Sequence, residues 1–170
     1  MPGLTEVRWH ARAGQGAKTA AHTLALALLG SGKSVQAFPE YGPERRGAPL
    51  RAFTRVSDRP IRRHDGVTDP DLVVVLEPSL VHEVDVADGL RPEGLILLNG
   101  DTVPPELAGL PVRCVPAGHN TNLVMLGAVA AALGEPPLAD IQDAAVQTLG
   151  RKVPPEEIRS AVEEGYACLR

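Results

Sequence analysis

The chain contains few cysteines. Its 170 residues include only Cys114 and Cys168, which lie far apart and form no metal-ligand spacing. An iron–sulfur cluster generally needs four cysteine ligands, so this chain cannot supply a complete set. Nothing in the pattern indicates a disulfide scaffold, and we expect a reducing, cytoplasmic compartment.

Aromatic residues and long apolar runs are also scarce. Aromatics make up 3% of the chain and hydrophobic residues 44%, so a core must be built from Ala, Val, Leu and Ile, as is common in α/β proteins. The length suits a single domain over residues 1–170. No apolar run reaches the roughly 18 residues that span a bilayer, and the N-terminus lacks the pattern of a signal peptide. The net charge of −4 argues against nucleic-acid binding. We therefore expect neither a membrane nor a nucleic-acid partner.

The charge is unevenly distributed. Residues 45–63 contain seven arginines and one aspartate, whereas the rest of the chain is acidic. Arginine suits bidentate contacts with carboxylates or phosphates better than lysine does. Two interpretations stay open: a solvated strand face, or a surface for docking or anion binding.

Alternating strand and helix patterns predict an α/β fold. The expected strands are 6–10, 35–38, 50–56, 71–76, 94–98 and 112–115, and Ser79 is expected to cap a short helical segment ending near residue 86. The expected helices are 17–29, 122–133, 139–149 and 155–169, with His22 packed inside the first. Strands 35–38 and 50–56 could pair antiparallel around the loop 39–49, or that loop could carry a longer crossing. The pattern predicts a three-layer α/β/α sandwich with a mostly parallel sheet, a mixed sheet being left open, and a helical C-terminal cap.

A glycine turn, Gly14-Gln15-Gly16, lies between the first strand and its helix. Backbone amides and the helix dipole at such a turn attract anions. A dinucleotide fingerprint would need a third glycine where Thr19 stands. The turn is therefore either a tight turn needing unusual backbone angles, or a place where a ligand or partner approaches closely.

The segment Gly30-Ser31-Gly32-Lys33-Ser34 is similar to the end of a phosphate-binding loop. That motif needs glycine where Ala27 stands, and it follows a strand and opens a helix. Here the segment closes a helix, so we interpret it as a helix end and turn.

A proline- and glycine-rich loop carries two adjacent arginines. Its residues Tyr41, Gly42, Glu44, Arg45, Arg46 and Gly47 are, with the glycine turn, the candidate contacts to a partner or ligand. Prolines and glycines restrict the loop, which reduces the entropy lost on docking. Whether the loop meets protein or cofactor is left open.

The sequence shows no catalytic set. No Ser/His/Asp order or nucleophile elbow occurs, and the five histidines have no metal spacing. Asp101 follows Asn99-Gly100, but no paired asparagines complete a thiamine diphosphate motif downstream. Asp69, Asp71, Glu77 and Asp101 lie near strand ends, where α/β folds place ligands, but acids there are also ordinary turn residues.

Several motifs together resemble the gamma subunit of the 2-oxoacid:ferredoxin oxidoreductases, a family that includes the pyruvate and ketoisovalerate (branched-chain) enzymes. Ala13 departs from the usual glycine of that family. The resemblance covers nearly the whole chain and rests on the R-x-G-Q-G turn at 12–16, EYGPERRGAP at 40–49, DLVVVLE at 71–77, NTNLVMLGAVAAALG at 120–134 and EEGYACL at 163–169.

The resemblance implies a role within a multisubunit enzyme. That enzyme oxidatively decarboxylates a 2-oxoacid, couples it to coenzyme A and reduces ferredoxin. Thiamine diphosphate and iron–sulfur clusters are expected on alpha, beta and delta-type partner subunits. This chain would bind no cofactor alone, carry no catalytic residue, and be structural or substrate-contacting. A free-standing nucleotide- or coenzyme A-binding protein is the alternative, and a pure interaction module is a third.

Overall fold

The computed structural model describes residues 3–40 and 46–170. These residues form a mixed six-stranded sheet in the order β2-β3-β1-β4-β5-β6. β1 is parallel to β4, and β4, β5 and β6 run parallel to one another, whereas β3 is antiparallel to both β1 and β2. The strands are β1 (Leu4–Arg12), β2 (Ser34–Pro39), β3 (Pro49–Ser57), β4 (Leu72–Val75), β5 (Leu95–Asn99) and β6 (Val112–Val115).

Side-chain alternation along β1 gives the sheet two different faces. Val7 and Trp9 are fully buried in the larger core, under the helices. Glu6, Arg8 and His10 point to the opposite face and are also buried. The sheet centre is therefore apolar toward the helices and charged on the other side.

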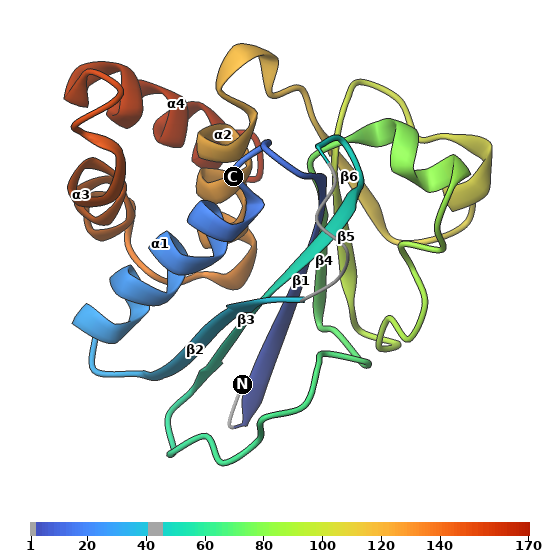
Figure 1. The fold of residues 1–170 in the computed structure, drawn as a ribbon, viewed down its shortest axis with the longest axis horizontal. Helices are drawn as coiled ribbons and strands as arrows, with labels where there is room; N and C mark the ends of the chain where they lie inside the picture. Colours follow the sequence, from blue (N-terminus) through green and yellow to red (C-terminus); the bar gives the residue numbers. More distant parts are fainter. Residues whose placement is uncertain (1–2, 41–45) are drawn as a thin grey trace.

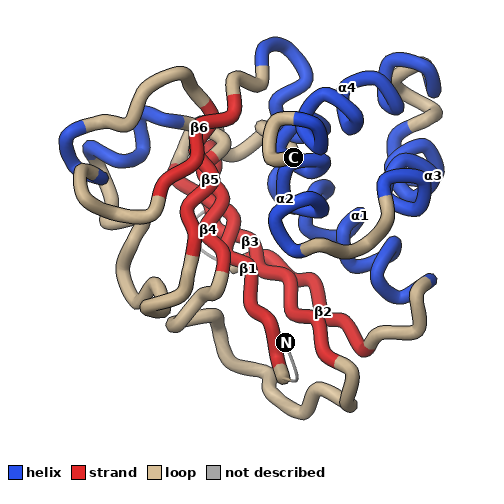
Figure 2. The backbone as a smooth tube through the Cα atoms, turned by 180° about the vertical axis from the view of Figure 1, so that it is seen from behind, coloured by secondary structure: helices blue, strands red, loops and turns tan. Residues whose placement is uncertain are grey.

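The α-helices lie together against one face of the sheet (Figure 1). They are α1 (Ala17–Gly30), α2 (Thr121–Leu133), α3 (Leu138–Leu149) and α4 (Pro155–Ala167). The view from behind shows the same arrangement (Figure 2). The predicted α/β fold with C-terminal helices is confirmed, and the open alternative of a mixed sheet is the one that forms.

The third layer is thin. A second core cluster contains Val73, Val75, Ile96 and Leu98 and is covered by loops and two short 3₁₀ helices, η1 (Pro78–His82) and η2 (Pro105–Leu107). Prolines and glycines interrupt these two connections, for example Pro92 and Gly94 after β4 and Pro104 and Gly109 after β5, so longer helices do not form there.

Two local expectations were wrong. The segment expected to be helical to residue 86 is only the 3₁₀ turn η1, and its cap is Glu77, whose side chain accepts from the Ser79 amide, rather than Ser79. His22 was expected to pack inside α1, but its side chain is exposed because it lies on the outer side of the helix. None of the helices in residues 3–40 and 46–170 is long and apolar enough to cross a bilayer.

Candidate functional site

The two segments singled out in the sequence meet at one edge of the sheet. β1 ends at Arg12, and its Cα partner in β3 is Pro49, the first residue of that strand. The glycine turn that follows β1 therefore lies beside the loop that precedes β3. Tyr41, Gly42, Glu44 and Arg45 lie outside the described residues, whereas Arg46 and Gly47 are described and exposed.

Two hydrogen bonds join the turn to the loop. The amide of Ala13 donates to the carbonyl oxygen of Ala48 over 3.0 Å. The Arg12 guanidinium donates from Nη1 to the carbonyl oxygen of Gly47 over 3.2 Å. Ala13 stands where the resembling family usually has glycine, but among the described residues only glycines have positive φ. Alanine therefore fits this turn without backbone strain.

The glycines of the turn have the unusual angles that the sequence suggested. Gly14 has φ +95° and Gly16 has φ +84°, values that favour glycine. Between them, the Gln15 side chain accepts from the Arg12 amide over 2.6 Å and donates to Glu77 Oε2 over 2.9 Å. Gln15 thus stabilises the turn and links it to Glu77, just after β4.

The turn also packs against the beginning of α2. A Cβ built on Gly16 would lie 2.7 Å from Nδ2 of Asn122, so a larger residue here would force the Asn122 side chain to move. The N-termini of α1 and α2 therefore converge. Gly16 has no side chain to cap α1, and the Asn120 side chain makes no cap hydrogen bond with α2 but donates to Glu157 Oε1 over 2.9 Å; neither first turn holds an acid. Both dipoles present positive ends to the same region, which favours anions.

Hydrogen bonds and an ion pair link the glycine turn to residues 77–83. Arg12 donates from Nη2 to Ser79 Oγ over 2.9 Å and forms an ion pair with Glu83. Ser79 Oγ donates to Glu77 Oε1 over 2.8 Å. Burial opposes ionisation of Glu77, but hydrogen bonds from Ser79 and Gln15 outweigh it and lower its pKa. The Arg12 hydrogen bond lowers the pKa of Glu83. Both carboxylates are therefore charged at neutral pH.

Sequence reasoning missed most of this network. Glu77 was weighed only as a strand-end acid, and Arg12 was seen only as part of a motif. Their positions could have indicated them: Arg12 is the last residue of β1 and Glu77 follows β4, and α/β folds place functional groups at the carboxyl ends of parallel strands. Of the other strand-end acids, Asp71 lies at the opposite edge of the sheet.

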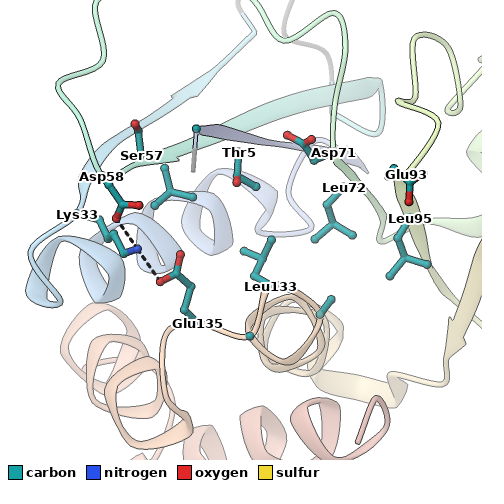
Figure 3. Close-up of a pocket in the computed structure, with 14 residues that line it drawn as sticks. Thr5, Lys33, Ser57, Asp58, Asp71, Leu72, Glu93, Leu95, Leu133 and Glu135 are labelled. Carbon is teal, nitrogen blue, oxygen red and sulfur yellow. Dashed lines mark hydrogen bonds and ion pairs between the residues drawn. The ribbon is translucent and has the colours of Figure 1, made fainter. Parts of the chain in front are cut away.

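That opposite edge holds a polar cavity of about 500 Å³ (Figure 3). Lys33 Nζ lies 2.7 Å from Asp58 Oδ1 and 3.0 Å from Glu135 Oε2 there. The lysine of the segment similar to a phosphate-binding loop is therefore held in ion pairs. α1 ends at Gly30 and Gly32 has φ +81°. The interpretation of this segment as a helix end and turn is confirmed.

The edge of the sheet where the glycine turn meets the arginine loop carries backbone amides, the Gln15 amide side chain, two carboxylates and an exposed arginine. Among residues 3–40 and 46–170, no group of three or more His, Cys, Asp or Glu side chains is arranged to hold a metal ion. These groups suit the contact of an anion or a partner surface.

A family model described as pyruvate ferredoxin/flavodoxin oxidoreductase matches residues 6–168. The chain belongs to this family. The matched region contains the glycine turn, the arginine loop and the late helices. The match therefore includes both the glycine turn and the arginine loop, which meet at one edge of the sheet.

Named relatives show which type of subunit the chain is similar to. The pyruvate/ketoisovalerate oxidoreductases common subunit gamma of Pyrococcus furiosus is 40% identical, over 94% of this chain and 95% of the relative. Pyruvate synthase subunit PorC of Thermotoga maritima is 38% identical, over 95% of this chain and 92% of the relative. The resemblance to gamma subunits stated from the motifs is confirmed.

A solved structure shows the same fold. The crystal structure of pyruvate oxidoreductase subunit PORC from Thermotoga maritima superposes with a TM-score of 0.77 at 34% identity, covering 98% of this chain and 96% of that one. These relatives give no support to a free-standing nucleotide- or coenzyme A-binding protein. The chain is a gamma-type member of its family.

Proposed function

We propose that this chain is the gamma subunit of a multisubunit 2-oxoacid:ferredoxin oxidoreductase, which oxidatively decarboxylates a 2-oxoacid to an acyl-coenzyme A and reduces ferredoxin. The family match over residues 6–168 carries this proposal. The partners are alpha, beta and delta-type subunits, and the complex works in the cytoplasm. Thiamine diphosphate and iron–sulfur clusters reside on those partners.

The site that this chain contributes is the joined surface of the glycine turn and the arginine loop. Its described members are Gly14, Gln15, Gly16, Arg46 and Gly47. We propose that Tyr41, Gly42, Glu44 and Arg45, which lie outside the described residues, also belong to this site. Support comes from the two hydrogen bonds that hold the turn and the loop together, because a preassembled surface loses little entropy on docking.

The surface fits an anionic group. Two helix N-termini without acidic first turns point toward it, and Arg46 is exposed beside it. A carboxylate of a partner subunit and a phosphate of coenzyme A share this chemistry. Coenzyme A would supply the thiol that accepts the acyl group, and the residues here would hold only its anionic part.

The test replaces both loop arginines in the reconstituted complex. Arg45→Ala with Arg46→Ala should leave the isolated domain folded and weaken assembly or raise the coenzyme A requirement. An exposed ion pair is worth about 0–1 kcal/mol, whereas truncating a buried interfacial charge costs about 2–5 kcal/mol. A loss in assembly affinity assigns the loop to a partner subunit, and a raised KM for coenzyme A assigns it to the co-substrate. Unchanged values in both assays would contradict the proposed site.

A further inference from the structure

A second segment that contains several arginines lies at the opposite edge of the sheet from the glycine turn. β3 starts beside the turn at Pro49 and ends at Ser57, and residues 58–71 then lead to β4 with neither helix nor strand. Loops longer than about 12–15 residues without secondary structure are uncommon in compact domains and usually functional or disordered. In Figure 1 this connection, drawn in green, protrudes below the sheet.

Side-chain hydrogen bonds from β2 and β3 tie the connection to the sheet. Arg55 is fully buried; its Nε donates to Glu6 Oε1 over 2.8 Å and its Nη2 donates to the carbonyl oxygen of Gly66 over 3.2 Å. Gln36 Nε2 donates to the carbonyl oxygen of Arg63 over 2.9 Å, and Val67 is buried. The middle of the connection is therefore linked to the sheet through Gln36 and Arg55.

The two acids of residues 58–66 are already engaged. Asp58 pairs with Lys33, as Figure 3 shows. Asp65 pairs with Arg63 and with the buried Arg55. The hydrogen bond from Arg63 is the first cause that lowers the pKa of Asp65, to about 2. These carboxylates are therefore charged and occupied at neutral pH.

Two arginines remain without an acid. Arg59 and Arg62 are exposed, and no carboxylate among the described residues pairs with either of them. His64 is exposed beside them. Residues 58–66 thus hold three arginines against two acids, whereas Asp69 and Asp71 follow in the same connection and the chain as a whole carries a net charge of −4.

We infer that residues 58–66, here called the basic loop, dock against an acidic surface of another subunit of the complex. This inference rests on the proposed function and adds a second contact, at the edge opposite the glycine turn. Charge complementarity indicates the partner: exposed guanidinium groups that no carboxylate of the described residues pairs with match carboxylates on a partner subunit. A protein is favoured over nucleic acid because the chain is acidic overall and the loop carries no aromatic platform for stacking bases.

The experiment measures association of the chain with the remaining subunits of its complex. The variant is Arg59→Glu with Arg62→Glu. The matched control is Arg151→Glu with Lys152→Glu, two exposed basic residues in the turn between α3 and α4 that likewise lack a carboxylate partner among the described residues. Both variants change the net charge equally, so a difference between them reports position rather than total charge.

The charge-reversed loop should associate about tenfold more slowly than wild type at low salt, because opposite charges steer encounter. The deficit should shrink at about 1 M salt, where the screening length is about 3 Å. The control should stay within about twofold of wild type. Equal rates for wild type and the Arg59/Arg62 variant, with thermal unfolding showing both folded, would overturn the inference.

Other outcomes separate this inference from the function on which it rests. If wild type and the basic-loop variant both associate normally, the result contradicts the inference about the basic loop but leaves the proposed function intact. If wild type does not associate with those subunits, the result contradicts the proposed function and therefore also the inference that rests on it. Self-association lost in the variant, seen by sedimentation, would assign the loop to a second copy of this chain. Salt-sensitive binding to a DNA oligonucleotide, lost in the same variant, would assign it to nucleic acid. Either result overturns the inference.

Discussion

The amide of Ala13 donates a 3.0 Å hydrogen bond to the carbonyl oxygen of Ala48. This bond joins two segments more than thirty residues apart and places the glycine turn next to the end of the arginine loop. The Arg12 side chain adds a second link, to the carbonyl oxygen of Gly47. The chain's own hydrogen bonds therefore hold the glycine turn against Gly47 and Ala48.

Removing the Arg12 guanidinium should loosen this junction while the fold persists. Arg12→Met keeps most of the apolar stem but removes the contacts to Gly47, Ser79 and Glu83. We expect faster hydrogen exchange at the Ala13 amide, because the bond to Ala48 then opens more often. Amides in α4 serve as the internal control. Unchanged protection at Ala13 would show that Arg12 does not hold the two segments together.

Gly16→Val should destabilise the protein. The residue has φ +84°, and a Cβ would lie 2.7 Å from the Asn122 side chain. Backbone strain of this kind costs of order 1–3 kcal/mol, and the steric contact adds to it. Chemical denaturation measures the change in the free energy of unfolding. Gly30→Val is the control, because Gly30 has an ordinary φ and open space around its Cβ position. Equal stability of the two variants would remove the special geometry assigned to the turn.

The sequence predicted the architecture better than the site. Strand periodicity correctly put Val7 and Trp9 on one face, because alternation is a local property of the chain. His22 was misplaced because a helix rich in alanine and leucine looks buried all round, and only the tertiary packing shows which side is outward. The contacts of Gln15 with Glu77 and of Gly16 with Asn122 join distant segments. No local pattern specifies such pairs.

Close packing of α2 against α4 depends on two glycines. A Cβ on Gly165 would lie 1.7 Å from the carbonyl oxygen of Val124, and one on Gly127 would lie 1.9 Å from that of Val162. Gly165→Ala must push the helices apart, so we expect a loss above about 3 kcal/mol in the free energy of unfolding, as for severe overpacking. The control is Gly66→Ala, an exposed position with open space. A Gly165→Ala variant as stable as this control would contradict the packing described.

His10 should make the folded state sensitive to mild acid. Burial, with the charges of Arg8 and Arg51, lowers its pKa from 6.5 to about 3. The unfolded chain therefore binds a proton below pH 6.5 that the folded chain excludes until about pH 3. The free energy of unfolding should fall as pH falls through this window, by up to about 1.4 kcal/mol per pH unit.

His10→Gln isolates this effect, since an amide oxygen can still accept the hydrogen bond from Arg8 Nε that His10 Nε2 accepts over 3.1 Å. Between pH 6.5 and 4.5 the variant should lose stability less steeply than wild type. The control is His22→Gln, at an exposed histidine on the outer side of α1. Parallel curves for wild type and His10→Gln would show that His10 titrates normally in the folded state.

The most direct test of the central claim is reconstitution of the oxidoreductase from its separately purified subunits, with coenzyme A-dependent reduction of ferredoxin by a 2-oxoacid as the readout. The account predicts no activity from this chain alone, little from the other subunits without it, and recovery when it is added at equal stoichiometry. Full activity of the other subunits without this chain, or the absence of any complex that contains it, would contradict the account.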